Sequence, residues 1–580
     1  MKFITFAHSL QALEKEPSRL AMTKLLAELF DECSATEIEV VTYFSLGSLF
    51  APYQDKQFNI ASKSMIEIIA ELVQKSPEAV HKEFKHKGDL GLTVQELWDG
   101  QDAGLSILQV YQDLVEIAEI SGTGSTEKRS DKVQKLLKQV DSLGAKFIVR
   151  MITKTLRLGF SDMTILDGLS WMQGGDKKLS KDLEAAYNVC ADLGLVAKTL
   201  KEKGIKGIQA MQIHVGIPIR PAAAERLSSS KAVVEKLGHC VAQPKLDGFR
   251  VQLHLKKTGS KTEVHFFSRN MLDMSVMFPE LKKAVTHLQV SSLICEGEAI
   301  VYDQDSESFL PFQQTVKRKR KHGVDQASLD FPLRLYLFDI LYLDGVSLLD
   351  KTHQQRRETL QKLLQKNKDE TLHIVEQKEI KTAKDLEHYF AQSIQSGLEG
   401  LVVKREDAIY QPGKRNFNWI KLKREAHGSL LDTIDVVILG YYKGRGKRAK
   451  FGIGAFLVGV FNEHKDRFET VAKVGTGMTD VEWQDLKKQC DKIQVAIQPK
   501  NVICAKELFP DVWLSPAIVC TVQSDEITQS PLHTAGKTDE HLGLALRFPR
   551  FITYRSDKSG NDATSVVELQ HLYREQKIKA

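Results

Sequence analysis

The chain has 580 residues, of which 42% are hydrophobic and 27% are charged. This length predicts about three or four domains, and the ordinary composition excludes a disordered chain, a collagen and a coiled-coil rod. Lys and Arg number 81 against 75 Asp and Glu, so the formal net charge is only +6 and any binding of nucleic acid must come from local basic clusters.

Cysteine usage and hydropathy narrow the class of protein further. The seven cysteines include no Cys-x-x-Cys pair, which argues against a cysteine-ligated zinc or redox site. No apolar run reaches the ~18 residues of a membrane-spanning helix, and charge returns near the start of the chain before a signal-peptide core accumulates. We therefore expect free thiols, a cytosolic location and no membrane partner.

The first part of the chain has a helical pattern. Apolar residues recur at three- and four-residue spacing in segments such as 18–30, 60–73 and 132–156. A Gly122–Thr126 turn separates two such segments, and its Ser125 or Thr126 is expected to cap the helix that follows. These patterns predict an all-α domain over residues 1–215.

Strand patterns replace helices in the rest of the chain. From about residue 238, short apolar strands alternate with Gly, Asp and Asn turns, which predicts an α+β domain over residues 216–428. A further change near residue 432 predicts a small β-barrel over residues 429–580. Its expected strands are 436–442, 455–461 and 468–474.

A lysine beside a tight turn is the sharpest local motif. Gln243-Pro-Lys245-Leu-Asp247-Gly248-Phe-Arg250 places the lysine just before an Asp-Gly turn. A lysine acts as a nucleophile only when neutral, and desolvation or neighbouring cations can lower its pKa enough for that. A solvated lysine at a hairpin turn is the alternative for this motif alone.

Further motifs follow in a fixed order through the middle of the chain. They are Ser268-Arg269-Asn270, Glu296-Gly297-Glu298, Phe338-Asp339, Glu399-Gly400-Leu-Val-Val-Lys404 and Trp419-Ile-Lys421-Leu-Lys423. With the lysine motif, this series resembles the ordered motifs of the covalent nucleotidyltransferases, and it is most similar to the ATP-dependent DNA ligases. Segments 41–52 and 145–162 look like the helical domain of those enzymes, and 510–513 with 546–558 look like their final domain.

The resemblance implies a fold, a reaction and cofactors. It implies a helical DNA-binding domain, an α+β nucleotidyltransferase (adenylation) domain and an OB-fold β-barrel, in that order. The expected activity is ATP- and Mg²⁺-dependent sealing of 3′-hydroxyl, 5′-phosphate nicks in duplex DNA, with AMP carried on Lys245 and then on the DNA. DNA repair, replication and recombination are the processes that such an activity serves.

The resemblance also assigns roles to individual residues. It implies a nucleotide site of Gln243, Arg250, Arg269, Glu298, Phe338, Arg415, Lys421, Lys423, Arg555 and Lys558, and magnesium ligands Glu298 and Glu399. These residue types suit the roles: arginines donate to ribose or phosphate, an aromatic ring stacks on adenine, and carboxylates bind Mg²⁺. Taken singly, each also fits a surface ion pair, a core aromatic or a solvated strand face.

Two strand-level expectations add to these roles. Lys421 and Lys423 alternate on one expected strand, so they share a face with Trp419 and are placed to hold the α-phosphate. Glu298 and Glu399 are expected at strand ends, and Phe338 at the end of an apolar strand.

The residue two positions before the lysine departs from the family pattern. Many members have Glu there, which accepts from the adenine amino group, whereas this chain has Gln243. An amide can accept through its oxygen but can also donate through its nitrogen. ATP is the expected nucleotide, with ADP or GTP as open substitutes.

Two basic runs favour binding to DNA phosphates. They are Lys317–Lys321 and Lys443–Arg448 with Lys450, although each run alone also fits a solvated charged surface. The expected partner is nicked duplex DNA, a sliding clamp is a candidate partner, and the protein is expected to act as a monomer. A nucleoid-associated protein of a bacterial or archaeal cytoplasm fits better than a nuclear one, because no long disordered extension precedes the helical domain.

Two other classes of function stay open at this point. An RNA ligase or a capping-type nucleotidyltransferase shares the chemistry of the middle domain but does not account for the long helical domain. A non-catalytic DNA-binding protein is the second alternative, against which the intact Lys245 and the Arg555-Ser-Asp557-Lys558 motif argue. An NAD-dependent ligase is disfavoured, because its four-cysteine zinc element has no counterpart here.

Overall fold

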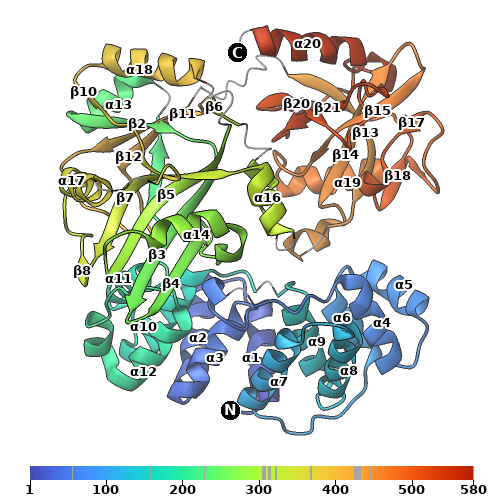
Figure 1. Cartoon of the computed structure of the whole chain (residues 1–580). Helices are drawn as coiled ribbons and strands as arrows, with labels where there is room; N and C mark the ends of the chain where they lie inside the picture. The colour runs from blue at the N-terminus through green and yellow to red at the C-terminus, as the bar shows by residue number, and fades with distance from the viewer. Residues whose placement is uncertain are drawn as a thin grey trace. The chain divides into compact units, whose positions relative to one another are not determined.

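The chain forms two compact units in the computed structural model (Figure 1). The first contains residues 1–80 and 90–424, and the second contains residues 81–89 and 425–580. The structure describes residues 1–54, 56–156, 158–227, 229–303, 308–310, 315–320, 323–365, 367, 369–396, 398–423, 433–444 and 446–578. The predicted domain boundary at 428 and the residue near which the pattern changes, Asp432, lie outside the described residues.

The N-terminal region is helical, as the sequence predicts. Its helices are α1 (Phe3–Lys15), α2 (Arg19–Asp31), α3 (Ala35–Ser45), α4 (Ser62–Leu72), α5 (Pro77–Lys87), α6 (Leu90–Leu97), α7 (Ile107–Glu119), α8 (Ser125–Leu137), α9 (Ser142–Ile152), α10 (Asp162–Gly174), α11 (Ser180–Val189) and α12 (Leu193–Gln209). The α2 helix shows why they form: Ser18 caps its first turn, and Leu26, Leu29 and Phe30 bury one face.

Two details of the helical prediction are wrong. The segment 132–156 is not one helix, because it breaks after Leu137 and Asp141 caps a new helix, α9. The α8 helix is not capped by a hydroxyl: Gly124 is its N-cap residue, with φ +74° and no side-chain cap, and Ser125 opens the helix. A left-handed glycine fixes where the helix starts, so the hydroxyls fall inside its first turn.

Two sheets follow within the first unit. The strands are β1 (Ala223–Arg226), β2 (Cys240–Lys245), β3 (Phe249–Thr258), β4 (Lys261–Ser268), β5 (Ser292–Asp303), β6 (Ser308–Phe309), β7 (Leu333–Leu343), β8 (Val346–Ser347), β9 (Leu372–Ile374), β10 (Lys378–Ile380), β11 (Gly400–Arg405) and β12 (Arg415–Lys423). The five-stranded sheet has the order β1-β12-β11-β2-β10. The seven-stranded sheet has the order β4-β3-β5-β7-β8, with β6 beside β5 and β9 beside β7.

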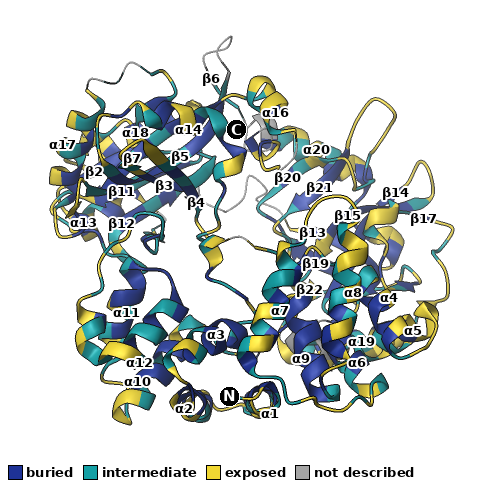
Figure 2. Ribbon diagram, turned by 60° about the horizontal axis from the view of Figure 1, so that its bottom comes forward, coloured by how far each residue is buried: buried dark blue, intermediate teal, exposed yellow. Residues whose placement is uncertain are grey.

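Helices cover both sheets, and their apolar faces build the core. The helices are α13 (Ser230–Leu237), α14 (Pro279–Thr286), α16 (Val324–Asp330), α17 (His353–Leu364) and α18 (Ala383–Gln395). Leu281 of α14 packs on the seven-stranded sheet, whereas Val233 of α13 and Leu386 of α18 pack on the five-stranded sheet. Full burial of such side chains contributes about 1.5–3 kcal/mol each. Figure 2 shows the resulting burial along the inner strands.

The second unit is rich in strands. They are β13 (Ile434–Tyr442), β14 (Ala455–Asn462), β15 (Arg467–Val474), β16 (Gln494–Val495), β17 (Val502–Ile503), β18 (Val512–Leu514), β19 (Val519–Gln523), β20 (Glu526–Ser530), β21 (Gly543–Arg547) and β22 (Arg550–Tyr554), with helices α19 (Asp480–Asp491) and α20 (Val566–Ile578). The three strands expected from the sequence match β13, β14 and β15 within a few residues. Strands β13 to β19 and β22 form one sheet, and β20 pairs with β21. Among the described residues, no helix is long and apolar enough to span a membrane.

Candidate active site

The register of the five-stranded sheet aligns several of the predicted site residues, which form one wall of a cleft. Strand β11 lies between β2 and β12, so Val402 is paired with Gln243 on one side and Lys421 on the other. Two residues along, Gly400 is paired with Lys245 and Lys423. Residues at i and i+2 of a strand share a face, so both rows present their side chains on the same side of the sheet.

Gly400 is a glycine for a steric reason. Its φ is +144°, and a Cβ atom built on it would lie 2.3 Å from the carbonyl oxygen of Leu422. The absence of a side chain lets β11 and β12 approach closely at the row that holds the two lysines. Glu399, immediately before this glycine, can then direct its carboxylate to both of them.

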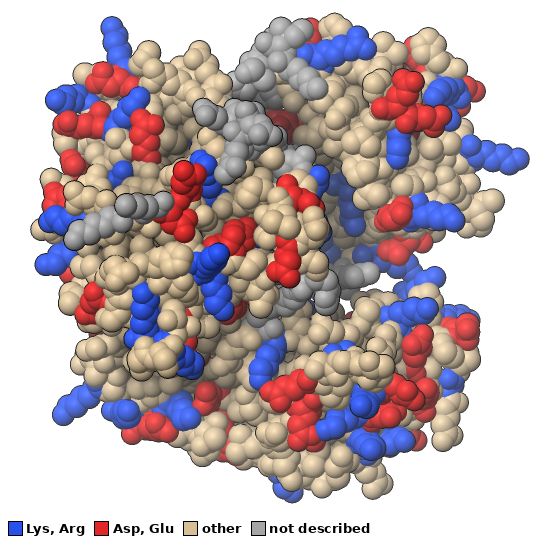
Figure 3. All heavy atoms as spheres, viewed as in Figure 1, with Lys and Arg blue, Asp and Glu red and all other residues tan. Residues whose placement is uncertain are grey.

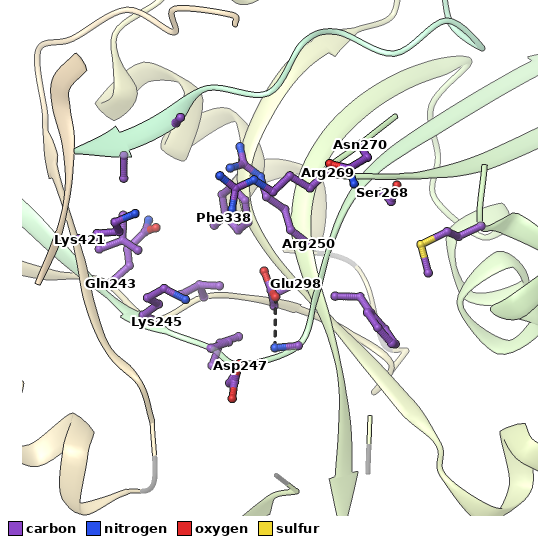
Figure 4. Close-up of a pocket in the computed structure, with 18 of the residues that line it drawn as sticks. Gln243, Lys245, Asp247, Arg250, Ser268, Arg269, Asn270, Glu298, Phe338 and Lys421 are labelled. Carbon is purple, nitrogen blue, oxygen red and sulfur yellow. Dashed lines mark hydrogen bonds between the residues drawn. The ribbon is translucent and has the colours of Figure 1, made fainter. Parts of the chain in front are cut away.

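The opposite wall comes from the seven-stranded sheet. The chain passes from one sheet to the other at Asp247 and Gly248. The backbone N–H of Gly248 donates to Oε1 of Glu298 at 3.2 Å (Figure 4). Arg250 of β3 is paired with Glu298 of β5. Phe338 lies where the β5–β7 register shifts by a residue, and this bulge positions its ring at the cleft.

Two sequence expectations need correction on this wall. Glu298 lies in the middle of β5 rather than at its end, and Phe338 lies inside β7 rather than at its end. The sequence predicts strand ends there because glycines and polar residues interrupt the apolar pattern. The structure shows that these residues are accommodated by register shifts within long strands.

The two walls enclose a cleft of about 690 Å³. Figure 4 shows Gln243, Lys245 and Lys421 on one side and Phe338, Arg250 and Arg269 on the other. The predicted residues that line it are Gln243, Lys245, Arg250, Arg269, Glu298, Phe338, Lys421 and Lys423. Cavities of this size hold small-molecule ligands of nucleotide dimensions.

An acidic group bridges the two lysines at one end of the cleft. The Glu399 carboxylate forms ion pairs with the ammonium groups of both Lys245 and Lys423. Burial would raise the pKa of Glu399, but the two ammonium groups outweigh that effect and lower it. Glu399 is therefore a carboxylate that holds the ammonium of Lys245 in place.

Cations concentrate around the same lysine pair. Burial lowers the pKa of Lys421, and the positive charges of Lys423, Arg415, Arg269 and Lys245 lower it further. Like charges held this close indicate a site built for an anionic ligand. Arg415 is exposed at the start of β12 and is near this cluster, although it is not among the residues that line the cleft.

Two polar side chains of the opposite wall, Arg250 and Glu298, line the cleft. Arg250 donates through Nη2 to the Glu296 carboxylate at 2.9 Å and through Nη1 to the Ala222 carbonyl at 2.9 Å. Within the described part of the chain, its Nε atom is buried and has no hydrogen-bond partner. Burial raises the pKa of Glu298 to about 7, although the nearby Lys245 and Arg250 oppose the shift.

Comparisons with known proteins identify the family to which this cleft belongs. The model of the ATP dependent DNA ligase domain matches residues 221–423, that of the DNA ligase N terminus matches 2–170, and that of the ATP dependent DNA ligase C terminal region matches 449–558. A probable DNA ligase of Dictyoglomus turgidum is 40% identical over 579 residues, covering 100% of this chain and 98% of that protein. The chain belongs to the ATP-dependent DNA ligases. It is thus a ligase that uses ATP and acts on DNA.

Other relatives agree over the full length of the ligase. DNA ligase 1 of Methanosarcina acetivorans is 35% identical, covering 99% of each chain. A solved structure titled Pmar-Lig_PreS3 shares the fold at a TM-score of 0.56 and 17% identity, covering 95% of this chain and 99% of that one.

The final motif of the ligase lies in the second unit. Nη1 of Arg555 and Nζ of Lys558 both donate to Oδ2 of Asp435, at 2.7 and 2.8 Å. Arg555 also forms a two-pronged ion pair with Asp557, whose pKa this contact lowers to about 2. Asp435 is mostly buried on β13, and Thr521 donates to its other oxygen at 2.6 Å.

The basic runs of the ligase are only partly available to DNA. Arg318 is 1% exposed and pairs with Glu280, so it is a core residue rather than a phosphate contact. Arg448 donates to the carbonyls of Gly454 and Gly475 and supports that loop. Lys321 and Arg445 lie outside the described residues. Figure 3 shows basic and acidic side chains intermixed on the face that it presents.

Sequence reasoning missed several polar residues that the ligase places around the cleft. Glu296 is 1% exposed and holds Arg250, and it also accepts from the Tyr410 hydroxyl at 2.8 Å. Lys404 is 1% exposed, lines the cleft and donates to the Phe338 carbonyl at 3.2 Å. Glu296 and Lys404 stood inside quoted motifs, but Gln377, which bonds to Gln243 at 3.0 Å, had no motif to signal it.

Proposed function

We propose that Lys245 is the nucleophile of a nick-sealing reaction in three phosphoryl transfers. Its neutral amine would attack the α-phosphorus of ATP, forming a P–N bond as pyrophosphate leaves. The AMP would pass to an oxygen of the 5′-phosphate at a nick in duplex DNA, which breaks the P–N bond and frees the lysine. The 3′-hydroxyl would then attack that 5′-phosphorus, and AMP would leave.

The single observation that carries this proposal is the placement of Lys245 beside Glu399 within a cluster of cations at the cleft. Phosphoryl transfer depends chiefly on positioning and on electrostatic stabilisation of the charge on the transferring group. Lys421 and Lys423, with Arg415 near them, would supply that charge around the α-phosphate.

The opposite wall supports binding of the nucleoside. The Phe338 ring offers a flat apolar face to adenine, and Gln243 lies across the cleft to meet the edge of the base. The guanidinium groups of Arg250, which lines the cleft, and of Arg269, which is exposed, would donate to ribose or phosphate oxygens. Each group then has a distinct part of ATP to bind.

Glu298 and Glu399 have the chemistry of magnesium ligands. Mg²⁺ is held in nucleotide sites by one or two carboxylates together with substrate phosphates, and the proposed ligands are Glu298, which lines the cleft, and Glu399, which pairs with Lys245 beside it. When bound, the ion would neutralise charge on the phosphates.

The remaining parts of the chain have proposed roles as well. We assign residues 1–215 to DNA binding, 216–428 to adenylation and 429–580 to an OB-fold domain, in which Arg555 and Lys558 would contact the pyrophosphate part of ATP during the first transfer. The protein would act as a monomer on nicked DNA, with a sliding clamp as a candidate partner. Relatives from bacteria and archaea support a place near the nucleoid.

Covalent labelling tests the proposal directly. Wild type, Lys245→Ala and the control Lys256→Ala, an exposed lysine on β3, are incubated with Mg²⁺ and α-labelled ATP, then denatured. Wild type and the control should carry label that a chase with nicked duplex DNA removes as the nick closes, and Lys245→Ala should carry none. Label on Lys245→Ala would exclude this lysine as the nucleophile, and label that only RNA ends remove would favour an RNA ligase.

A further inference from the structure

In the proposed function Gln243 meets the edge of the base with an amide that can either accept or donate, and neighbouring side chains restrict which it does. Resting on the proposed function, we propose that Gln377 and His353 fix the Gln243 amide so that its oxygen meets the base, and thereby select adenine over guanine. Gln377 and His353 are thus positioning residues for nucleotide specificity.

The contact between the two glutamines follows from the sheet. Strand β10 runs antiparallel to β2 with Lys378 paired to Ala242 and Ile380 paired to Cys240. Continuing this register by one residue places Gln377 opposite Gln243, and side chains of opposed residues lie on the same face. Nε2 of Gln243 donates to Oε1 of Gln377 at 3.0 Å.

The oxygen of Gln243 is left for a ligand. The residue is 2% exposed and lines the cleft. Within the described part of the chain, no group donates to its Oε1. This oxygen is also not fully enclosed, so a ligand can reach it. An amide whose nitrogen is engaged behind it therefore presents an acceptor to the cleft.

His353 fixes the second amide in turn. Its Nε2 lies 3.1 Å from the same Oε1 of Gln377. The ring is buried, and burial together with the positive charge of the nearby Lys404 lowers its pKa, whereas Asp339 opposes the shift. Nδ1 has no hydrogen-bond partner in the described part of the chain and is 3.8 Å from Oδ2 of Asp339. Because the Gln377 amide oxygen can only accept, the ring nitrogen that meets it, Nε2, is the donor in this contact.

Arg356 holds the Asp339 carboxylate that lies beside the His353 ring. Nε of Arg356 donates to Oδ1 at 2.7 Å and Nη2 donates to Oδ2 at 3.0 Å, with both side chains buried. Gln377 thus receives two hydrogen bonds on one oxygen, from His353 and from Gln243. Turning the Gln243 amide by 180° would oppose two acceptor oxygens across this contact, and turning the Gln377 amide would oppose its NH2 group to two donors.

The chemistry of the bases converts this geometry into selectivity. Adenine carries an amino donor at C6, whereas guanine carries a carbonyl acceptor at the same position. A fixed amide oxygen accepts from the first and opposes the lone pairs of the second. An unmet buried polar group of this kind reduces affinity at least about 10-fold.

The test measures lysyl-nucleotide formation from α-labelled ATP and from α-labelled GTP, as kcat/KM for each. Gln377→Leu removes the acceptor, so the ratio of ATP to GTP should fall at least about 10-fold. Gln377→Glu retains an acceptor and should keep most of the preference. Gln361→Leu, an exposed glutamine of α17, is the matched control and should leave the ratio unchanged.

A second measurement uses the wild-type protein alone. A purine ribonucleoside triphosphate without the 6-amino group should be used at least about 10-fold less well than ATP. An unchanged ATP-to-GTP ratio in Gln377→Leu, or equal use of this analogue and ATP by wild type, would overturn the inference. These outcomes differ from a failure of the proposed function. In that case wild type would take no label from ATP, or Lys245→Ala would still take it.

Discussion

The carboxylate of Glu399 holds the ammonium group of Lys245 in an ion pair at the cleft. This contact positions the lysine, whose amine is a nucleophile only when it is neutral. The pair therefore describes a resting arrangement. The Nζ atom must be neutral when it attacks the α-phosphorus in the proposed first transfer.

Replacing Glu399 by Gln should slow formation of the lysyl adduct at least about 100-fold, because both the positioning of Lys245 and a proposed magnesium ligand are lost. Single-turnover labelling with ATP measures this rate. Glu379→Gln, an exposed glutamate that pairs with His239, is the control and should label normally. Normal labelling of Glu399→Gln would show that Glu399 has no role in forming the lysyl adduct.

Lys558 should matter mainly for the first transfer. In the structure Lys558 pairs with Asp435, which Arg555 also binds. In Lys558→Ala the carboxylate keeps Arg555 as a partner, so we expect the unit to stay folded. We expect lysyl-AMP formation to fall at least about 10-fold and sealing of a pre-adenylated nick to change little. Lys506→Ala, an exposed lysine of the same unit, is the comparison. A variant that adenylates normally yet fails to seal would contradict the assignment.

Part of this site was predictable from the sequence, for identifiable reasons. Alternation along one strand places Lys421 and Lys423 together, because the period of two is a local property. The row formed by Gln243, Val402 and Lys421 was not predictable, because the pairing of distant strands is set by the packed sheets.

Charge patterns misled where burial decided the outcome. Arg318 belongs to a basic run, yet it is buried because Glu280, 38 residues earlier in the chain, offers it a carboxylate beneath the surface. Gln377 carried no signal at all, since its role depends on a cross-strand neighbour and on His353.

The ion pair between Asp339 and Arg356 should be costly to break from one side. Both groups are at most 2% exposed, and Arg356→Met would leave a buried carboxylate without its partner. We expect a loss of about 3–5 kcal/mol in the free energy of unfolding of the first unit. Urea unfolding followed by tryptophan fluorescence measures it. The double variant Asp339→Leu/Arg356→Met should recover much of the loss, and a mild single variant would refute this account.

Lys404 should give the stability of the first unit a specific pH dependence. Burial lowers its pKa to about 7, with Asp339 opposing the shift, whereas an unfolded lysine titrates near 10.4. Between these values the unfolded chain binds one more proton than the folded chain, so stability rises with pH at up to about 1.4 kcal/mol per unit. The excess stability of Lys404→Met over wild type should therefore shrink from pH 7 to pH 10. A difference that is flat over this range would show that Lys404 is charged when folded.

Gly400 offers a test of how backbone geometry supports the lysine pair. A Cβ at this position meets the Leu422 carbonyl at 2.3 Å, so Gly400→Ala must separate β11 from β12 where Lys245 and Lys423 face Glu399. Gly345 in the β7–β8 turn is the matched control, because its φ is +90° but nothing lies within 4 Å of its Cβ position.

Gly345→Ala should lose roughly 1–2 kcal/mol from backbone strain alone and retain adenylation. Gly400→Ala should lose about 1–3 kcal/mol more from the clash and should also adenylate more slowly. Equal losses in the two variants, with normal adenylation in both, would mean that the close approach at Gly400 does not position Glu399.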